Sequence, residues 1–232
     1  MQSAHACAVQ THFFVFTFQW PKAPKKEPKS FTKWSLWAPE ITKKPEKQTL
    51  KKTQKNGCKK HIDGARIFNA IIKTGIDAKR MTRDYDSVSI CFSKGMGAPV
   101  GSVLVGSTEF IARAHRWRKM FGGGWRQAGI LAQACLFALD NNIQRMEKDH
   151  ERAKRIAAAI NSMDAFSVDL DTVQTNMVYV TCEKSAPKVV EELQKHGIDL
   201  FDLGPNSVRI VCHLHIDDED EQRIIKAFSQ LR

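Results

Sequence analysis

The sequence predicts an α/β protein, because short β-branched runs alternate with segments in which apolar residues recur every three or four positions. Runs such as Ser87–Phe92 (SVSICF) and Ser207–Cys212 (SVRIVC) are typical of strands. The segment Asp217–Arg232 has the helical period, and the acidic residues in its first turn suit the helix dipole. This alternation begins near residue 61 and continues to the end of the sequence.

The elements expected between residues 61 and 160 have clear boundaries, because glycines bound the strands and a hydroxyl residue begins one helix. In order, we expect a short helix at Arg66–Lys73 after a turn at HIDGA, strands at Ser87–Phe92 and Val100–Val105, a helix at Ser107–Met120 with Ser107 or Thr108 as its N-cap, and a helix from Gln127 that breaks at Asn141–Asn142 and resumes to Ile160.

The last 65 residues or so continue the alternation of strand and helix. In order, we expect a strand at Asn176–Thr181, a helix at Pro187–His196 closed by Gly197, a strand at Ser207–Cys212 and a helix from Asp217.

The charge of the chain is unevenly distributed. The formal net charge is +11, but residues 1–60 contain thirteen lysines, no arginine and three acids, so this segment carries +10. Five of the eight prolines also lie there, and no helical period is visible. We therefore expect residues 1–60 to form a disordered basic leader.

The lysines of the leader allow a second interpretation, an electrostatic arm for RNA, DNA or anionic lipid, which stays open. Because the excess charge belongs to the leader alone, we expect no nucleic-acid partner. The apolar runs are shorter than a bilayer requires, so we also expect no membrane association.

Six cysteines without a C-x-x-C pair fit a reducing compartment and hence the cytoplasm, although the scarcity of acids in the leader also permits a mitochondrial location.

Two motifs could carry chemistry in the first half of the ordered region. In HIDGAR, Asp63 precedes a tight turn, so its carboxylate can point into a crevice at the end of a strand or can cap the following helix. In SKGMGAP, Lys94 follows an apolar strand and stands among glycines that admit a flat ligand. Such surroundings suit a lysine that forms a Schiff base, and they equally suit a solvated lysine in a turn.

A third motif, RWRKMFGGGWRQ at residues 116–127, places four cations around three glycines. It could hold a phosphate, or it could be a solvated helix end with a flexible joint. The pair His213 and His215 has no third ligand at a suitable spacing, so we expect no metal site there.

Taken together and in order, the blocks HIDGARIFNA, SICFSKGMGAPVGSVLVGS and RWRKMFGGGWRQAGILA closely resemble low-specificity L-threonine aldolases. These are pyridoxal-phosphate enzymes of the aspartate-aminotransferase-like fold, grouped with the β-eliminating lyases. The resemblance covers residues 61–232, the C-terminal half of the family's chain. It implies an α/β fold made of part of the large-domain sheet followed by a small C-terminal domain.

The resemblance implies pyridoxal 5'-phosphate as the cofactor. Lys94 would be the catalytic residue and would hold the cofactor covalently as a Schiff base. Asp63 would bind the pyridine nitrogen, and Arg66 would lie beside the ring hydroxyl and the substrate. A carboxylate against that nitrogen keeps it protonated, which makes the ring an electron sink.

Three further residues gain roles from the same resemblance. Arg209 would pair with the carboxylate of a small amino-acid substrate, which a guanidinium can bind bidentately. Lys119 and Arg126 would face the cofactor or its phosphate, in a neighbouring subunit, because the family builds its sites at a dimer interface. The implied reaction is cleavage of L-threonine or L-allo-threonine to glycine and acetaldehyde, a lyase step in threonine catabolism and glycine biosynthesis.

Upstream of His61 the resemblance ends, and KKTQKNGCKK replaces the strand expected before Asp63. We therefore expect a leader at 1–60 that is unrelated to the family, a remnant of the cofactor-binding large domain at 61–126, and a linking helix with the small domain at 127–232. The function expected is that of an N-terminally truncated aldolase that forms homo-oligomers. The alternative is a non-catalytic isoform or decaying copy that pairs with a full-length subunit.

Overall fold

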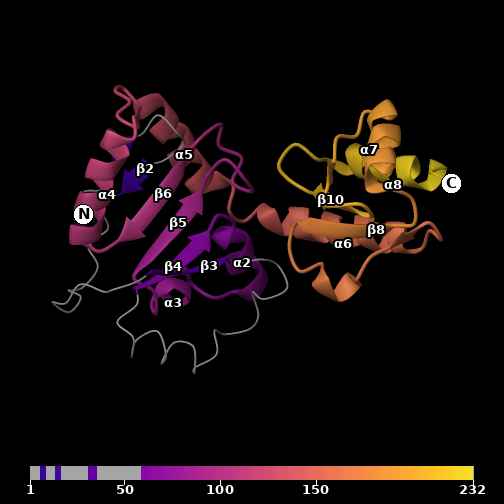
Figure 1. Cartoon of the computed structure of the whole chain (residues 1–232), viewed down its shortest axis with the longest axis horizontal. Helices are drawn as coiled ribbons and strands as arrows, with labels where there is room; N and C mark the ends of the chain where they lie inside the picture. The colour runs from indigo at the N-terminus through magenta and orange to yellow at the C-terminus, as the bar shows by residue number, and fades with distance from the viewer. Residues whose placement is uncertain (1–5, 9–13, 17–30, 36–58, 232) are drawn as a thin grey trace. The chain divides into compact units, whose positions relative to one another are not determined.

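The computed structural model describes the backbone of residues 6–8, 14–16, 31–35 and 59–231, and side chains within 59–231. The chain divides into two compact units, residues 1–144 and 145–232. Figure 1 shows the first unit in indigo to magenta and the second in orange to yellow. The boundary that we expected at residue 126 lies inside the first unit.

The first unit is built on a six-stranded sheet with the order β1-β2-β6-β5-β4-β3. Its strands are β1 (Ala6–Ala8), β2 (Phe14–Phe16), β3 (Phe31–Ser35), β4 (Lys59–Gly64), β5 (Ser87–Cys91) and β6 (Ser102–Gly106). Strands β3, β4 and β5 are mutually parallel, whereas β6 is antiparallel to β5. Strand β2 pairs in parallel with β6, and β1 pairs antiparallel with β2.

The helices of the first unit are α2 (Ile67–Thr74), α3 (Ala78–Thr82), α4 (Thr108–Met120) and α5 (Gly129–Asn141). Helix α2 packs Ile67 against Ile62 of β4 and Val88 of β5, which forms a small core on one face of the sheet. The expected N-cap of α4 is confirmed, because the Ser107 side chain accepts a hydrogen bond from the backbone N–H of Phe110.

We expect no strand in the lysine-rich run that precedes His61. This expectation is wrong for the last two residues of the run. Lys59 and Lys60 are the first residues of β4. Asp86, just before β5, compensates them: Lys59 Nζ lies 3.0 Å from its carboxylate, and the Lys60 backbone N–H donates to it at 2.8 Å. Pairing with β5 and this carboxylate therefore allow lysines to begin a strand inside the sheet.

Strands β1, β2 and β3 come from the leader for which we expect disorder. Lys59 and Lys60 belong to β4, and the other leader residues lie outside the described part of the chain.

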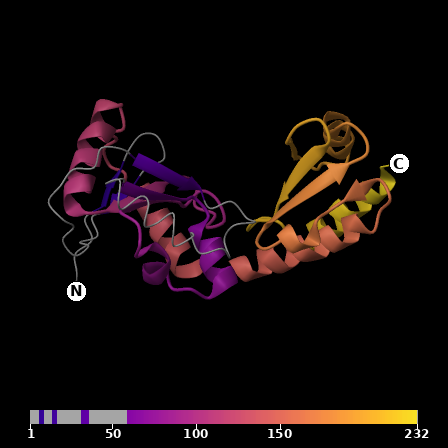
Figure 2. The same ribbon diagram turned by 60° about the horizontal axis from the view of Figure 1, so that its bottom comes forward.

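The second unit contains a four-stranded antiparallel sheet with the order β7-β8-β10-β9. Its elements are α6 (Met146–Asn161), β7 (Phe166–Ser167), the 3-10 turn η2 (Leu170–Thr172), β8 (Met177–Cys182), α7 (Ala186–Lys195), β9 (Phe201–Asp202), β10 (Ser207–Val211) and α8 (Asp218–Gln230). Figure 2 shows α6 lying along this sheet. Side chains such as Ile156, Val178, Val208 and Phe228 are buried together in one core.

Helix α8 has the acidic first turn that the sequence predicts, and it also has a capping box that was not predicted. The Asp217 side chain accepts from the backbone N–H of Asp220, and the Asp220 side chain accepts from that of Asp217. Across the described residues, each helix is too short or too polar to cross a bilayer.

Candidate active site

Asp63 is the penultimate residue of β4, and its partner in the sheet is Ser89 of β5. The alternative that Asp63 caps the next helix is not supported, since the N-cap position of α2 is Arg66 and no side-chain capping bond is present there. The carboxylate is half-buried and lies on the face of the sheet opposite Ile62.

Gly64 explains why the chain can turn sharply after Asp63. A Cβ at this position would lie 2.9 Å from the carbonyl oxygen of Ser89 and 3.0 Å from a methyl group of Val88. Only glycine allows the backbones of β4 and β5 to approach this closely before α2 begins. Arg66 therefore follows Asp63 within a single turn of chain, at the same end of β4.

Lys94 stands in a tight turn just after β5. The backbone N–H of Gly97 donates to the carbonyl of Lys94 at 2.8 Å, and that of Ala98 donates to the carbonyl of Phe92 at 3.0 Å. Gly97 has a φ of 70°, which favours glycine. The Lys94 side chain is exposed, while Met96 beneath the turn is almost fully buried. Its exposure would also suit a solvated lysine. The evidence for a role in a site is therefore the position of the turn in the sheet.

The direction of the strands places these residues together. Because β4 and β5 are parallel neighbours, their carboxyl ends lie at the same edge of the sheet. Asp63 and Arg66 follow from one of these ends and Lys94 follows from the other. Such an edge is where α/β sheets usually bind ligands.

Two buried asparagines touch the turn that carries Lys94, and the sequence did not single them out for this purpose. Asn69 of α2 lies against Gly95, and the Asn142 side chain donates to the carbonyl of Met96 at 2.7 Å. The available signal was an amide among the apolar residues of RIFNAII and a second one at the expected break after α5.

A polar row that was not predicted from the sequence lies on the same face of the sheet as Asp63. His61 Nδ1 lies 2.9 Å from Ser87 Oγ, and His61 Nε2 lies 3.3 Å from Ser89 Oγ. The alternation of small polar residues in SVSIC was the signal for it. Ser89 therefore contacts His61 and also pairs in register with Asp63.

Lys119 and Arg126 are exposed, Lys119 in the last turn of α4 and Arg126 between α4 and α5. Since β6 runs antiparallel to β5, α4 begins at the edge of the sheet opposite Lys94. The strand order therefore does not by itself place Lys119 and Arg126 at the edge of the sheet where Asp63 lies. Of the four cations in this motif, Arg118 has a structural contact, because it donates to the carbonyl of Gly123 beyond the end of α4.

Arg209 belongs to the second unit. It lies in β10 between Tyr179 of β8 and Phe201 of β9, on the face opposite the buried Val208 and Ile210. Its Nε atom is buried and has no hydrogen-bond partner among residues 59–231. An unpaired buried guanidinium nitrogen is costly, so this side chain suits an anionic partner.

The rings of His213 and His215 lie 5.7 Å apart in an edge-to-face arrangement. Within the side chains described for residues 59–231, no group of three His, Cys, Asp or Glu is placed to hold a metal ion.

Comparison with known proteins gives a family match for more than half of the chain. The profile of the family described as "Beta-eliminating lyase" matches residues 44–183. The match begins upstream of His61, so it includes residues 44–60, which we had assigned to a leader unrelated to the family.

Individual relatives agree with this match. The chain is 41% identical over 181 residues to the low-specificity L-threonine aldolase 1 of Arabidopsis thaliana, covering 76% of this chain and 51% of that protein. It is 42% identical over 173 residues to the low specificity L-threonine aldolase of Escherichia coli strain K12, covering 75% and 51%. The chain thus spans about half the length of these curated relatives.

Solved structures share the fold. The threonine aldolase of Leishmania major matches with a TM-score of 0.64 and 15% identity, covering 88% of this chain and 61% of that one. The L-threonine-O-3-phosphate decarboxylase of Porphyromonas gingivalis matches with a TM-score of 0.62 and 16% identity, covering 85% and 63%.

Proposed function

Because this chain belongs to the β-eliminating lyase family, whose members depend on pyridoxal 5'-phosphate, we propose that it carries the cofactor-attaching half of an L-threonine aldolase site. The substrate would be L-threonine or L-allo-threonine, and the products would be glycine and acetaldehyde. One observation carries the proposal: the parallel strands β4 and β5 bring Asp63, Arg66 and Lys94 to the same edge of the sheet.

The residues at this edge suit the cofactor. Lys94 offers an exposed amine on a turn in which Gly97 is also exposed, whereas Gly95 is buried against Asn69. Asp63 offers a carboxylate that the structure places in a strand and not in a helix cap. In this proposal Lys94 holds the cofactor covalently, Asp63 faces the pyridine nitrogen, and Arg66 lies beside the ring hydroxyl.

The bound cofactor supplies an electron sink for the carbon atom that loses its bond. The contribution of Asp63 is to keep a proton on the pyridine nitrogen, which a carboxylate does by stabilising the positive charge. Lys94 would contribute the amine that holds the cofactor. In the overall reaction, threonine loses its hydroxyl proton, its Cα–Cβ bond breaks to release acetaldehyde, and Cα gains a proton to give glycine.

Arg209 is proposed to bind the substrate carboxylate. The support is its buried Nε atom without a partner in the described part of the chain and its place between two aromatic residues. A guanidinium can form two parallel hydrogen bonds with a carboxylate and so fix the orientation of an amino acid.

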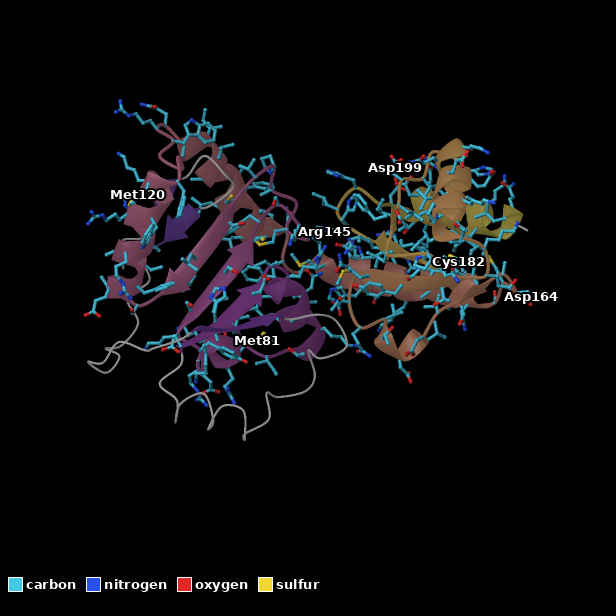
Figure 3. The ribbon with its side chains drawn as sticks, in the orientation of Figure 1. Met81, Met120, Arg145, Asp164, Cys182 and Asp199 are labelled. Carbon is cyan, nitrogen blue, oxygen red and sulfur yellow. The ribbon has the colours of Figure 1, made fainter. Side chains whose placement is uncertain are left out.

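We further propose that the chain assembles with a second copy through α4 and α5. The large apolar side chains exposed along this stretch are Trp117, Met120, Phe121, Trp125, Ile130, Leu136 and Phe137. Figure 3 labels Met120 at the end of α4. Assembly would cover this surface and would bring Lys119 and Arg126 to the cofactor phosphate of the neighbouring subunit.

The four described cysteines form no disulfide within residues 59–231, which fits a cytoplasmic location.

The experiment is an assay of acetaldehyde release from L-threonine by the full chain with added pyridoxal phosphate. We expect release that depends on the cofactor and is abolished by Lys94→Ala. Lys73→Ala, on α2 and outside the proposed site, is the matched control and should retain the activity. Release that is equal in both variants would refute the proposal. No release from the unaltered chain would favour the alternative, a non-catalytic chain that pairs with a longer relative.

A further inference from the structure

We propose that Asn69 and Asn142 are positioning residues that hold the turn carrying Lys94 from two sides. The proposal rests on the proposed function for the meaning of Lys94, but the contacts that it describes do not depend on a cofactor. Asn69 comes from α2 and Asn142 follows α5, so two separate helices act on the same short loop.

Two backbone hydrogen bonds close the turn, but within the loop few contacts fix its place relative to the rest of the unit. It is rich in glycine, and Lys94 points into solvent. Its buried apolar side chains, Phe92 and Met96, anchor it against the core but specify no direction for the backbone. Polar groups of a buried backbone need partners with defined geometry, so such partners determine where the turn lies.

Asn142 supplies one such partner. Its side chain is buried and donates to the carbonyl of Met96 at 2.7 Å, across 46 residues of sequence. The adjacent Asn141 is exposed and donates only to the carbonyl of Phe137 within its own helix. The two neighbouring asparagines therefore differ in role. The Asn141 side chain bonds within helix α5, whereas the Asn142 side chain bonds to the loop of Lys94.

Asn69 acts on the other side of the turn. It is 1% exposed, and its Oδ1 atom lies 2.8 Å from where a Cβ would stand at Gly95. The amide thus packs directly on the backbone beside Lys94. Because α2 starts soon after Asp63, the same rigid helix that follows Asp63 also contacts the turn of Lys94. Asn69 therefore connects the helix that follows Asp63 with the backbone of the turn that carries Lys94.

The choice of an amide has a physical reason. A leucine of similar size would fill either position, but at position 142 it would leave the buried Met96 carbonyl without its donor, and at position 69 it would remove the amide that packs against Gly95. An unsatisfied buried carbonyl is costly, so the loop would move to find another partner. Lys94 would then no longer be held at one place relative to Asp63.

The test compares Asn142→Asp with Asn141→Asp in the full chain. Both changes replace an amide by a carboxylate in adjacent residues, but only the first removes the donor to Met96. Two quantities are measured: the rate of borohydride-trapped labelling of Lys94 by pyridoxal phosphate, and the hydrogen exchange of the Gly97 and Ala98 amides that close the turn. For Asn142→Asp we expect labelling about tenfold slower and exchange about tenfold faster, as loss of one buried hydrogen bond implies, with little change for Asn141→Asp.

The pH dependence separates positioning from a general loss of structure. Burial raises the pKa of a carboxyl at position 142, and below that pKa its O–H can donate to Met96 in place of the amide. The ratio of labelling by Asn142→Asp to that by the unaltered chain should therefore rise towards one as the pH falls. A ratio that is constant with pH would contradict the proposal.

A second pair of variants covers the case in which Asn142→Asp does not fold. Gly95→Ala should slow labelling because its methyl group meets Asn69, and Asn69→Ala should restore part of that loss in the double variant. If both single variants label at the unaltered rate and leave the exchange of Gly97 unchanged, the proposal is wrong. If the unaltered chain is never labelled, the proposed function fails. The hydrogen exchange of the Gly97 and Ala98 amides then decides by itself whether the asparagines hold the turn.

Discussion

At the scale of single residues, Arg209 is the side chain of the second unit for which we propose a role in binding. It stands in a strand whose inward neighbours, Val208 and Ile210, belong to the core of the second unit. Its Nε atom is buried without a hydrogen-bond partner in the described part of the chain. Burying a guanidinium nitrogen without a partner costs free energy, and an anionic ligand would offset that cost.

Two substitutions of Arg209 should separate binding from stability. Arg209→Lys should raise the KM for threonine about tenfold or more, because one of two charge-assisted hydrogen bonds, about 1.5–3 kcal/mol, is lost. Arg209→Leu should raise KM further and leave the thermal midpoint unchanged or higher. Steady-state kinetics and thermal unfolding measure the two effects. Arg223→Lys, on the exposed surface of α8, is the control, and an unchanged KM in both Arg209 variants would remove this residue from the site.

The residues of the site differ in how far the sequence predicts them. Asp63 and Lys94 stand beside glycines after apolar strands, and that local pattern is enough to identify them as candidates. Asn69 and Asn142 carry no such pattern, because each acts on a loop that is distant in sequence. A contact of this kind depends on how helices pack on the sheet, which the local sequence does not reveal.

At the scale of elements, a group of ion pairs joins α6 to α8 in the second unit. Arg155 binds Glu221 through two hydrogen bonds of 2.7 and 2.6 Å, and Arg152 donates to Asp218 at 2.6 Å. Glu221 is buried, whereas Asp218 is largely exposed. The two carboxylates therefore sit on the same helix and share arginine partners, but their environments differ.

This difference predicts unequal effects on folding. Glu221→Gln should lower the free energy of unfolding by about 3 kcal/mol, because it leaves the charges of Arg152 and Arg155 without their buried partner. Asp218→Asn should have a much smaller effect, since water and salt screen an exposed pair. Urea unfolding of the two variants measures this contrast. Equal losses of unfolding free energy in the two variants would show that burial of the carboxylate does not determine how much each ion pair stabilises the fold.

The longer elements follow from the sequence and the shorter ones do not. The predicted strand Ser207–Cys212 is observed at Ser207–Val211, and the helix predicted at Pro187–His196 is observed at Ala186–Lys195. By contrast, α3, β7 and β9 were not predicted, because strands of two residues and a helix of five have too few residues for a period to show. Strand β4 was obscured by its lysines, which become acceptable only through the distant Asp86.

At the scale of the whole molecule, exposed apolar side chains of α4, α5 and the segment between them motivate the proposed assembly with a second copy. Phe121 is 80% exposed and Ile130 is 84% exposed. The part of α5 that is buried consists of small residues, Cys135 and Ala138. A helix that is apolar on several sides is usually covered on more than one of them.

Assembly through this surface gives a prediction with a matched control. Phe121→Asp should shift the chain from oligomer to monomer, because burying a carboxylate in an apolar interface is unfavourable. Leu170→Asp, which changes an exposed apolar residue of the second unit, should leave the oligomer intact. Sedimentation velocity over a range of concentrations measures the state. If the Phe121 variant assembles as the unaltered chain does, the interface lies elsewhere.

The central claim is that the edge of the sheet at Asp63 and Lys94 is a cofactor site with Lys94 as its attachment point. The most direct measurement is reduction with borohydride in the presence of pyridoxal phosphate, followed by peptide mapping of the label. We predict a single dominant label on the peptide that contains Lys94, lost in Lys94→Ala and weakened in Asp63→Asn, whose amide cannot hold the proton of the pyridine nitrogen. Label spread evenly over the surface lysines, and unchanged in both variants, would contradict the claim.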